Sequence, residues 1–194
     1  MSINLTKGAK INLTKDFAGL NDIQVGLGWD VAKPKGLLKG LLGSGNFDLD
    51  ASVVVLDDKG MGLELVYFGK MKGTGIAHQG DNLTGAGEGD DEVINVSLAK
   101  LHANANKLRF IVNIYDGEKR KQKFGDVENA FIRLVDKRNN QELCKYNLNK
   151  DFPEATGMYI GEIYKHNNEW KFSATEEGFT GGLGTVSKQY KVRT

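Results

Sequence analysis

Short runs in which apolar and polar residues alternate recur along the whole chain. Alternation with a period of two is typical of a β-strand that buries one face, because successive side chains point to opposite sides of a sheet. The pattern predicts about eleven strands, at residues 3–6, 11–14, 23–29, 51–56, 63–68, 92–98, 108–115, 130–136, 142–148, 158–164 and 169–174. Between them stand the residues that tight turns favour, such as Asp57-Asp58-Lys59-Gly60 and Asn167-Asn168.

Helical patterns are sparse. Residues 97–105, with Ser97 as N-cap, predict one or two turns, and residues 126–130 predict another. Short strands at regular spacing, without long helices between them, favour an all-β fold over a parallel α/β fold. We therefore expect an antiparallel β-sandwich of two sheets with long metal-binding loops and one or two short helices. A length of 194 residues fits a single domain, residues 1–194.

The segment at residues 33–43, KPKGLLKGLLG, interrupts the strand pattern. Its leucines recur at helical spacing among lysines and glycines. Two interpretations remain open: a loop that folds its leucines onto the sandwich, or an amphipathic segment that touches a membrane surface or a membrane partner.

Composition narrows the classes of function. The 26 basic and 25 acidic residues give a net charge of +1, so no global excess indicates a nucleic-acid partner. Cys144 is the one cysteine and cannot form a disulfide within the chain, which favours a reducing, cytoplasmic environment. The first twenty residues lack a signal-peptide pattern, and no apolar run is long enough to span a bilayer.

The segment at residues 80–92, GDNLTGAGEGDDE, holds five carboxylates and no basic residue. Carboxylates this close together either take up protons or bind a cation. The glycines at 85, 87 and 89 allow the backbone to turn its carbonyl oxygens inward. Calcium prefers many oxygen ligands at flexible angles, so the pattern predicts a calcium site. Zinc is disfavoured, because the histidines, His78 among them, are scattered and are interpreted as surface, turn or core residues.

This acidic segment differs from two well-known loops. Residues 81–92 have the length of an EF-hand loop, but Leu83 and Gly85 stand where oxygen-bearing side chains are required, and no helices flank it. A phosphate-binding loop presents amide hydrogens beside a lysine, whereas acids surround these glycines.

Three further acids could complete the site. Asp30 follows the strand predicted at residues 23–29. Asp48 and Asp50 are two residues apart in an extended segment, so their side chains would project to the same side.

A series of motifs runs through the chain in order: GLGWD at 26–30, FDLDAS at 47–52, HQGDNLTG at 78–85, GDDE at 89–92, IYD at 114–116, QKFG at 122–125, NAFIR at 129–133, GEIY at 161–164 and WKF at 170–172. Together they resemble the TerD-like tellurium-resistance and stress proteins over nearly the whole chain. The resemblance implies a bacterial, calcium-binding, non-enzymatic β-sandwich that is cytoplasmic.

The resemblance also implies a ligand set and partners. The metal ligands, around two calcium ions, would be Asp30, Asp48, Asp50, Asp81, Asn82, Asp90, Asp91 and Glu92. The partners would be a TerC-type integral membrane protein, which would hold the chain at the inner face of the membrane, and other tellurite-resistance proteins. The segment at residues 33–45 is longer than in many members, so partner contacts need not be shared.

Three hypotheses of function follow. In the first, calcium fixes a surface for binding a partner in the tellurite and stress response. In the second, calcium bridges the protein to an oxyanion or small ligand, such as tellurite, phosphate or a cyclic nucleotide, since relatives include a slime-mould protein that binds cyclic AMP. Lys70, Lys72 and the lysines of 119–123 could assist there. In the third, the protein is a metal-dependent hydrolase. This hypothesis is the weakest, because the sequence shows no evident set of catalytic residues to work with the acids.

Overall fold

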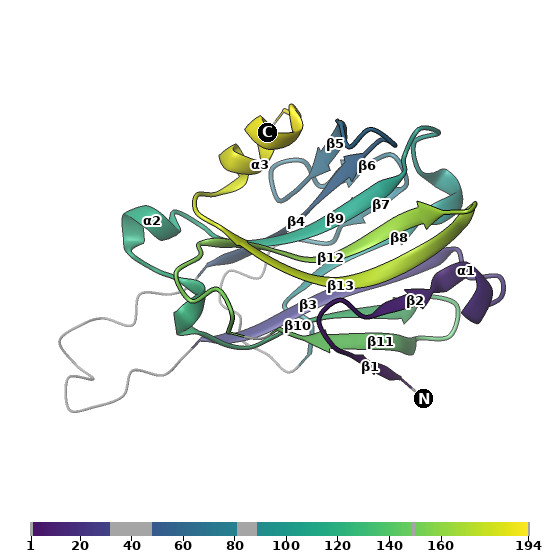
Figure 1. Cartoon of the computed structure of the whole chain (residues 1–194), viewed down its shortest axis with the longest axis horizontal. Helices are drawn as coiled ribbons and strands as arrows, with labels where there is room; N and C mark the ends of the chain where they lie inside the picture. The colour runs from purple at the N-terminus through teal and green to yellow at the C-terminus, as the bar shows by residue number, and fades with distance from the viewer. Residues whose placement is uncertain (1, 32–47, 81–88, 149, 194) are drawn as a thin grey trace.

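The structure, a computed structural model, describes residues 2–31, 48–80, 89–148 and 150–193. Its strands form two sheets that pack face to face (Figure 1). Neighbouring strands run antiparallel, except that β1 lies parallel to β11. The predicted two-sheet β-sandwich is confirmed.

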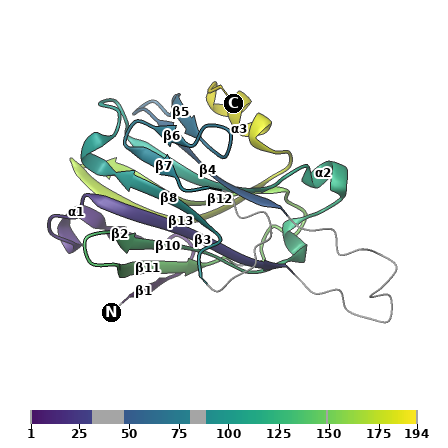
Figure 2. The same cartoon turned by 180° about the vertical axis from the view of Figure 1, so that it is seen from behind.

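Sheet A has the strand order β1-β11-β10-β3-β8-β7-β6 within the described residues. The view from behind shows β3 and β8 side by side in this sheet (Figure 2). Its strands are β1 Ile3–Leu5, β3 Asp22–Val31, β6 Lys72–Gly73, β7 Ile76–His78, β8 Glu92–Ser97, β10 Val127–Asp136 and β11 Gln141–Asn147.

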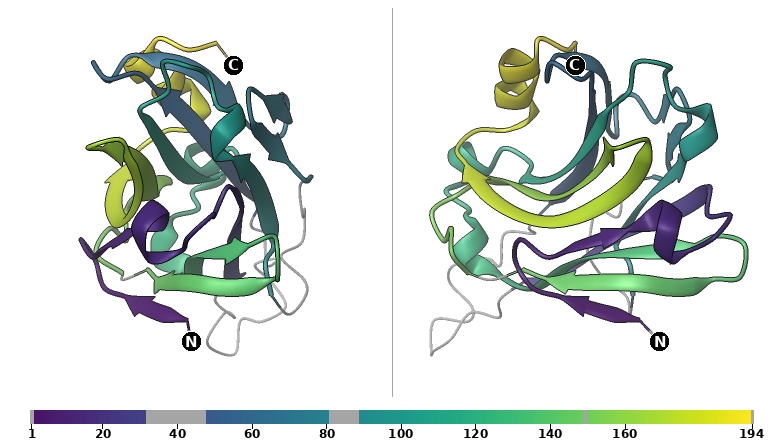
Figure 3. Two further views of the ribbon diagram at one scale, coloured as in Figure 1. Left: turned by 90° about the vertical axis from the view of Figure 1, so that its right-hand side faces the viewer. Right: turned by 45° about the vertical axis from the view of Figure 1, so that its right-hand side comes forward.

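Sheet B has the order β2-β13-β12-β9-β4-β5 over the same part of the chain. The two ends of the chain lie on opposite sides of the sandwich, the N-terminus by β1 and the C-terminus beyond the last helix (Figure 3). The strands of sheet B are β2 Lys10–Asn12, β4 Leu49–Leu56, β5 Gly62–Val66, β9 Lys107–Ile114, β12 Gly157–His166 and β13 Glu169–Phe179.

The helices are short but more numerous than expected. The described residues contain the α-helices α1 Leu13–Asp16, α2 Gly117–Arg120 and α3 Leu183–Tyr190, and single 3-10 turns at Leu98–Lys100 and Phe124–Asp126. The turn at Leu98–Lys100 confirms part of the helical prediction for residues 97–105: Ser97 stands at the N-cap position, but its side chain makes no capping hydrogen bond, and residues 101–105 are not helical. None of these helices is long and apolar enough to cross a membrane.

Two local predictions are wrong. Residues 13–14 begin α1 instead of continuing a strand, because the Asn12 side chain accepts a hydrogen bond from the Lys15 amide at 3.0 Å and caps the helix. Residues 127–130 belong to β10 instead of a helix, since the 3-10 turn ends at Asp126. Asn129 adopts a positive φ of 51° where the pairing of β10 with β3 shifts register.

The main core lies between the two sheets and follows the predicted alternation. On β3, Ile23, Val25 and Leu27 point inward and are fully buried. On β8, Ile94 and Val96 do the same, whereas Val93 between them is only partly buried. The Cys144 thiol lies in this core, and burial raises its pKa to about 12, so it stays protonated.

A second apolar cluster covers the outer face of sheet B. The helix α3 packs Val186 and Tyr190 onto Val54 of β4 and Ile111 of β9. Figure 1 shows α3 on the far side of β4 and β9 from β3, β10 and β11. Every residue of β4 is therefore buried, which is why its sequence is continuously apolar over 53–56.

Arg109 anchors α3 over this face. It is bonded to Tyr190 Oη at 2.6 Å and to Glu177 at 2.8 Å, and its Nε lies 2.7 Å from Glu162 Oε1. Its guanidinium also lies over the Tyr159 ring, 4.1 Å from the centroid. The guanidinium of Arg109 therefore has a structural role, because its contacts are with other side chains of the same fold.

The alternation on β8 gives a direct test of the core. We expect Ile94→Ala to lower the free energy of unfolding by about 2–5 kcal/mol, because it leaves a cavity between the sheets. The matched control Val93→Ala, on the outward side of the same strand, should cost less than about 1 kcal/mol. Urea denaturation of both variants measures the difference, and equal losses would contradict the assigned faces.

Candidate functional site

The end of the acidic segment passes over the outer face of β3, where two glycines make room for it. A side chain at Gly26 would clash with the carboxylate of Asp90. One at Gly28 would clash with the Phe131 ring and the carbonyl of Gly89. The GLG motif at 26–28 therefore serves a close approach of chain segments.

Asp90 is held by a base that the sequence pattern does not reveal. Arg133 Nε donates to Asp90 Oδ1 at 2.6 Å and Arg133 Nη2 donates to Oδ2 at 3.1 Å, a bidentate pair, and Gln24 adds a third hydrogen bond. This pairing, chiefly its hydrogen bond, raises the pKa of Arg133. The acidic segment contains no basic residue of its own, but Arg133 of β10 neutralises one of its acids, Asp90.

Asp91 extends the pairing of β3 with β8. Its amide donates to the Leu27 carbonyl at 2.7 Å, and its carboxylate accepts a hydrogen bond from the Trp29 amide at 2.8 Å. Burial raises the pKa of Asp91, and the nearby carboxylates of Asp30 and Asp90 raise it further against the opposing effect of the Trp29 hydrogen bond. An acid of β3 thus lies close to the two acids that immediately precede β8.

Asp30 stands at the exposed end of β3, beside Asp91. Its carboxylate accepts a hydrogen bond from the Asn129 amide group at 2.7 Å. Asp30 and Asp91 line one open hollow of about 720 Å³ on the outer face of sheet A. The other described residues that line it are Trp29, Gly89, Asn129, Ala130, Phe131, Lys145, Asn147, Leu148 and Lys150.

Glu92 points the other way, into the core, with an exposed fraction of 1%. Its Oε2 accepts a hydrogen bond from the Ala51 amide of β4 at 2.6 Å. His78 Nε2 lies 3.3 Å from the same oxygen and 3.1 Å from the Ala51 carbonyl. Because the Gly80 amide donates to His78 Nδ1, the neutral ring carries its proton on Nε2. Glu92 and His78 thus join sheet A to sheet B.

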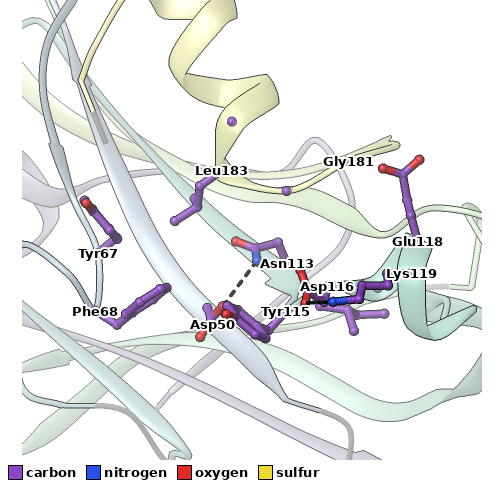
Figure 4. Close-up of a pocket in the computed structure, with 14 residues that line it drawn as sticks. Asp50, Tyr67, Phe68, Asn113, Tyr115, Asp116, Glu118, Lys119, Gly181 and Leu183 are labelled. Carbon is purple, nitrogen blue, oxygen red and sulfur yellow. Dashed lines mark hydrogen bonds and ion pairs between the residues drawn. The ribbon is translucent and has the colours of Figure 1, made fainter.

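Asp48 and Asp50 lie around the start of β4. Asp48 is half-buried, and its carbonyl accepts a hydrogen bond from the Tyr115 amide at 2.7 Å. Asp50 points to the outer face of sheet B, where Asn113 Nδ2 lies 3.4 Å from its carboxylate. It lines a second hollow, of about 390 Å³, near the start of α3 (Figure 4).

The predicted ligands that the structure describes therefore do not lie together in one place. It brings Asp30 and Asp91 to one hollow and Asp50 to another, and the two hollows share no described lining residue. Asp81 and Asn82 lie outside the described residues, as does the segment at 33–45. Within the described ranges, no three His, Cys, Asp or Glu side chains gather in a group that could hold a metal ion.

The donors at the first hollow suit a hard cation. Carboxylates at Asp30 and Asp91 and the amide side chains of Asn129 and Asn147 offer oxygen, the ligand atom that calcium prefers. A complete shell would need further oxygens, which the described residues do not supply as a group.

The predicted lysine helpers lie elsewhere. Lys70 pairs with Glu64 at 2.9 Å, and Lys119 lines the second hollow. Lys145 and Lys150 line the first hollow instead, and the sequence interpretation missed both. Lys145 follows the strand period of β11, so its alternation with buried Cys144 and Tyr146 is the signal that places it on the outer face.

The chain matches the family described as the TerD domain over residues 1–190. The chain belongs to the TerD family. It is 44% identical over 195 residues to general stress protein 16U of Bacillus subtilis (strain 168), covering 98% of this chain and 97% of that protein. It is also 38% identical over 197 residues to the tellurium resistance protein TerD of Serratia marcescens, covering 99% and 98%.

A solved structure shares the fold of this TerD-family chain. It is the crystal structure of a homologue of telluride resistance protein (TerD) from Streptomyces coelicolor A3(2). The TM-score is 0.69 at 20% identity, and the match covers 90% of this chain and 100% of that one. Family membership places the chain among the tellurium-resistance and stress-response proteins.

The Asp90–Arg133 pair predicts a measurable coupling. A double-mutant cycle with Asp90→Asn and Arg133→Met should give a coupling energy of about 0.5–2 kcal/mol in chemical denaturation, because the two side chains touch and Asp90 is nearly buried. The exposed Lys7–Asp151 pair, tested in the same way, should show clearly weaker coupling, since solvent screens it. Equal coupling in both cycles would contradict a structural role for Arg133.

Proposed function

We propose that this TerD-family protein binds calcium at the hollow between Asp30 and Asp91 and uses the ordered surface to bind a partner in the stress response. The observation that carries the proposal is the convergence of these two acids in one open hollow: Asp30 comes from the end of β3, and Asp91 immediately precedes β8. Burial raises the pKa of Asp91, and the negative charge of the Asp30 carboxylate raises it further. A cation placed there would relieve that repulsion.

The proposed ligand set is smaller than the set predicted from the sequence. Asp30 and Asp91 are its described members, and Asp81 and Asn82 are proposed to complete it from outside the described residues. Asp90 is engaged by Arg133, and Glu92 by Ala51 and His78. These contacts favour structural roles for Asp90 and Glu92, which hold residues 90–92 against β3 and the core.

The proposed partners follow from the family resemblance. They are a TerC-type integral membrane protein and other tellurite-resistance proteins, met in the cytoplasm at the inner face of the membrane. The proposal contains no catalytic step. Calcium would supply charge neutralisation and cross-linking of chain segments, and the side chains around the hollow would supply the contact surface.

Calcium binding should raise the melting temperature. A ligand that binds only the folded chain contributes about 2.7 kcal/mol at a hundredfold excess over its dissociation constant, equivalent to roughly 5–10 °C for a chain of this size. We expect this shift in differential scanning fluorimetry when calcium replaces a chelator. Asp30→Asn and Asp91→Asn should lose most of it, because each removes a charged ligand.

The control for this experiment is Asp58→Asn, an exposed acid in the turn between β4 and β5. It should keep the full calcium shift. If Asp30→Asn and Asp91→Asn also keep it, the ligand assignment is wrong. If the parent chain shows no shift at any calcium concentration, the proposal itself fails.

One observation favours a second function, the calcium-bridged capture of an oxyanion. Lys145 and Lys150 line the same hollow as Asp30 and Asp91, so an anion on the ion would meet two ammonium groups. Lys145 lies over the Phe131 ring, 3.8 Å from its centroid, and Lys150 lies 3.9 Å from Glu128. Phe131 itself lines the hollow, whereas Glu128 lies outside it.

Titration calorimetry separates the two functions. If capture occurs, tellurite should give heat with calcium present and none in chelator, and Lys145→Gln with Lys150→Gln should weaken it about tenfold. Lys70→Gln, whose partner Glu64 lies outside the hollow, is the matched control. Absence of heat in calcium-loaded protein would exclude capture and leave the partner-binding function.

A further inference from the structure

The second hollow opens on the outer face of sheet B, opposite the proposed calcium site. Its volume of about 390 Å³ lies within the range of small-molecule pockets, roughly 300–1,000 Å³. Figure 4 shows Asp50 and Asn113 with Tyr67 and Phe68 to one side, Asp116 and Glu118 at the start of α2 to the other, and Leu183 of α3 above them. Of the predicted calcium ligands within the described residues, Asp50 is the one that lines it.

The base of this hollow is polar, whereas the adjoining outer face of sheet B is apolar. Asp50 and Asn113 face each other in the pairing of β4 with β9, at the end of the face that continues as Val54 and Ile111 under α3. Asp50 has an exposed fraction of 2%. A carboxylate so far from bulk water acts on a nearby charge more strongly than one at the surface.

Two further acids stand on the side formed by α2. Asp116 precedes the helix in a left-handed conformation, with φ of 51°, and Glu118 lies in its first turn. Both line the hollow. The one basic side chain among the described lining residues is Lys119, whose Nζ lies 3.6 Å from Asp116. Because the Lys119 side chain is 84% exposed, solvent screens this pair strongly.

Aromatic rings form the opposite side. Phe68 is 40% exposed and packs at steep angles against both neighbours, with centroids 5.4 Å from Tyr67 and 6.3 Å from Tyr115. The interplanar angles are 84° and 77°. Rings at steep angles around a space form part of an aromatic cage, the arrangement that recognises alkylammonium groups.

The charge balance favours a cation over an anion. The start of α3 also lines the hollow and contributes roughly half a positive charge, and Lys119 contributes one more. Arg120, whose guanidinium lies 5.3 Å from the centroid of the Tyr115 ring, adds one more positive charge beside the hollow. The three lining carboxylates still outweigh these positive charges, and Asp50 lies deepest in the fold. A bare metal ion would gain little from the aromatic rings, whereas an organic cation gains from both sides.

We propose that this hollow binds a small organic cation with an alkylammonium head. The positive charge meets Asp50 and Asp116, and the methyl or methylene groups contact Phe68 and Tyr115. The site is separate from the proposed calcium hollow and does not depend on it.

Choline and its uncharged isostere 3,3-dimethyl-1-butanol test the proposal on the full chain. Titration calorimetry should show choline binding at least about tenfold tighter than the alcohol, because only choline carries the charge. Asp50→Asn and Asp116→Asn should each weaken choline binding several-fold. Phe68→Leu, an exposed substitution that keeps an apolar side chain, should weaken it as well.

Controls separate this site from calcium binding and from misfolding. Asp91→Asn should bind choline like the parent, and the melting temperature of each variant shows whether it folds. Choline and the alcohol binding equally, no binding by either, or unchanged affinity in both Asp50→Asn and Phe68→Leu would overturn the proposal. So would displacement of choline by calcium, which would place the ion at Asp50.

Discussion

The candidate site depends on two positions on the outer face of β3 that carry no side chain, Gly26 and Gly28. Gly26 and Gly28 let residues 89–92 pass close over the strand, and any side chain there would push them away. Once the segment lies against β3, the three consecutive acids separate. Asp90 meets Arg133 on the outer face, Asp91 bonds the end of β3 beside Asp30, and Glu92 enters the core. A run that looks uniform in sequence therefore has three physical roles.

Local alternation explains why most of the fold could be predicted. Strands such as β3 and β8 bury every second residue, and a period of two is visible without knowing the partner strand. The missed elements lack such a signal. The strands β6 and β7 have two and three residues, and α3 begins at a glycine N-cap without a side-chain hydrogen bond. Its helical state rests on packing against sheet B, which is a tertiary effect.

The sequence suggested the candidate site as a set of acids, but it did not show how these acids are arranged in space. Asp30 and Asp91 were identified from their residue type and neighbourhood, and the structure places them together. The partner of Asp90 comes from a strand 43 residues away, so charge counting within the segment could not find it. His78 was ambiguous for the same reason, because its buried contact with Glu92 depends on the pairing of β7 with β8.

The hydrogen bond between the Ala51 amide and Glu92 has a further consequence. Glu92 is the chain neighbour of Asp91, and Ala51 is the chain neighbour of Asp50. The two hollows open on opposite outer faces, yet one buried hydrogen bond and two peptide units separate their acids. A short path of covalent bonds and one hydrogen bond therefore connects the acids of the two hollows through the interior of the sandwich.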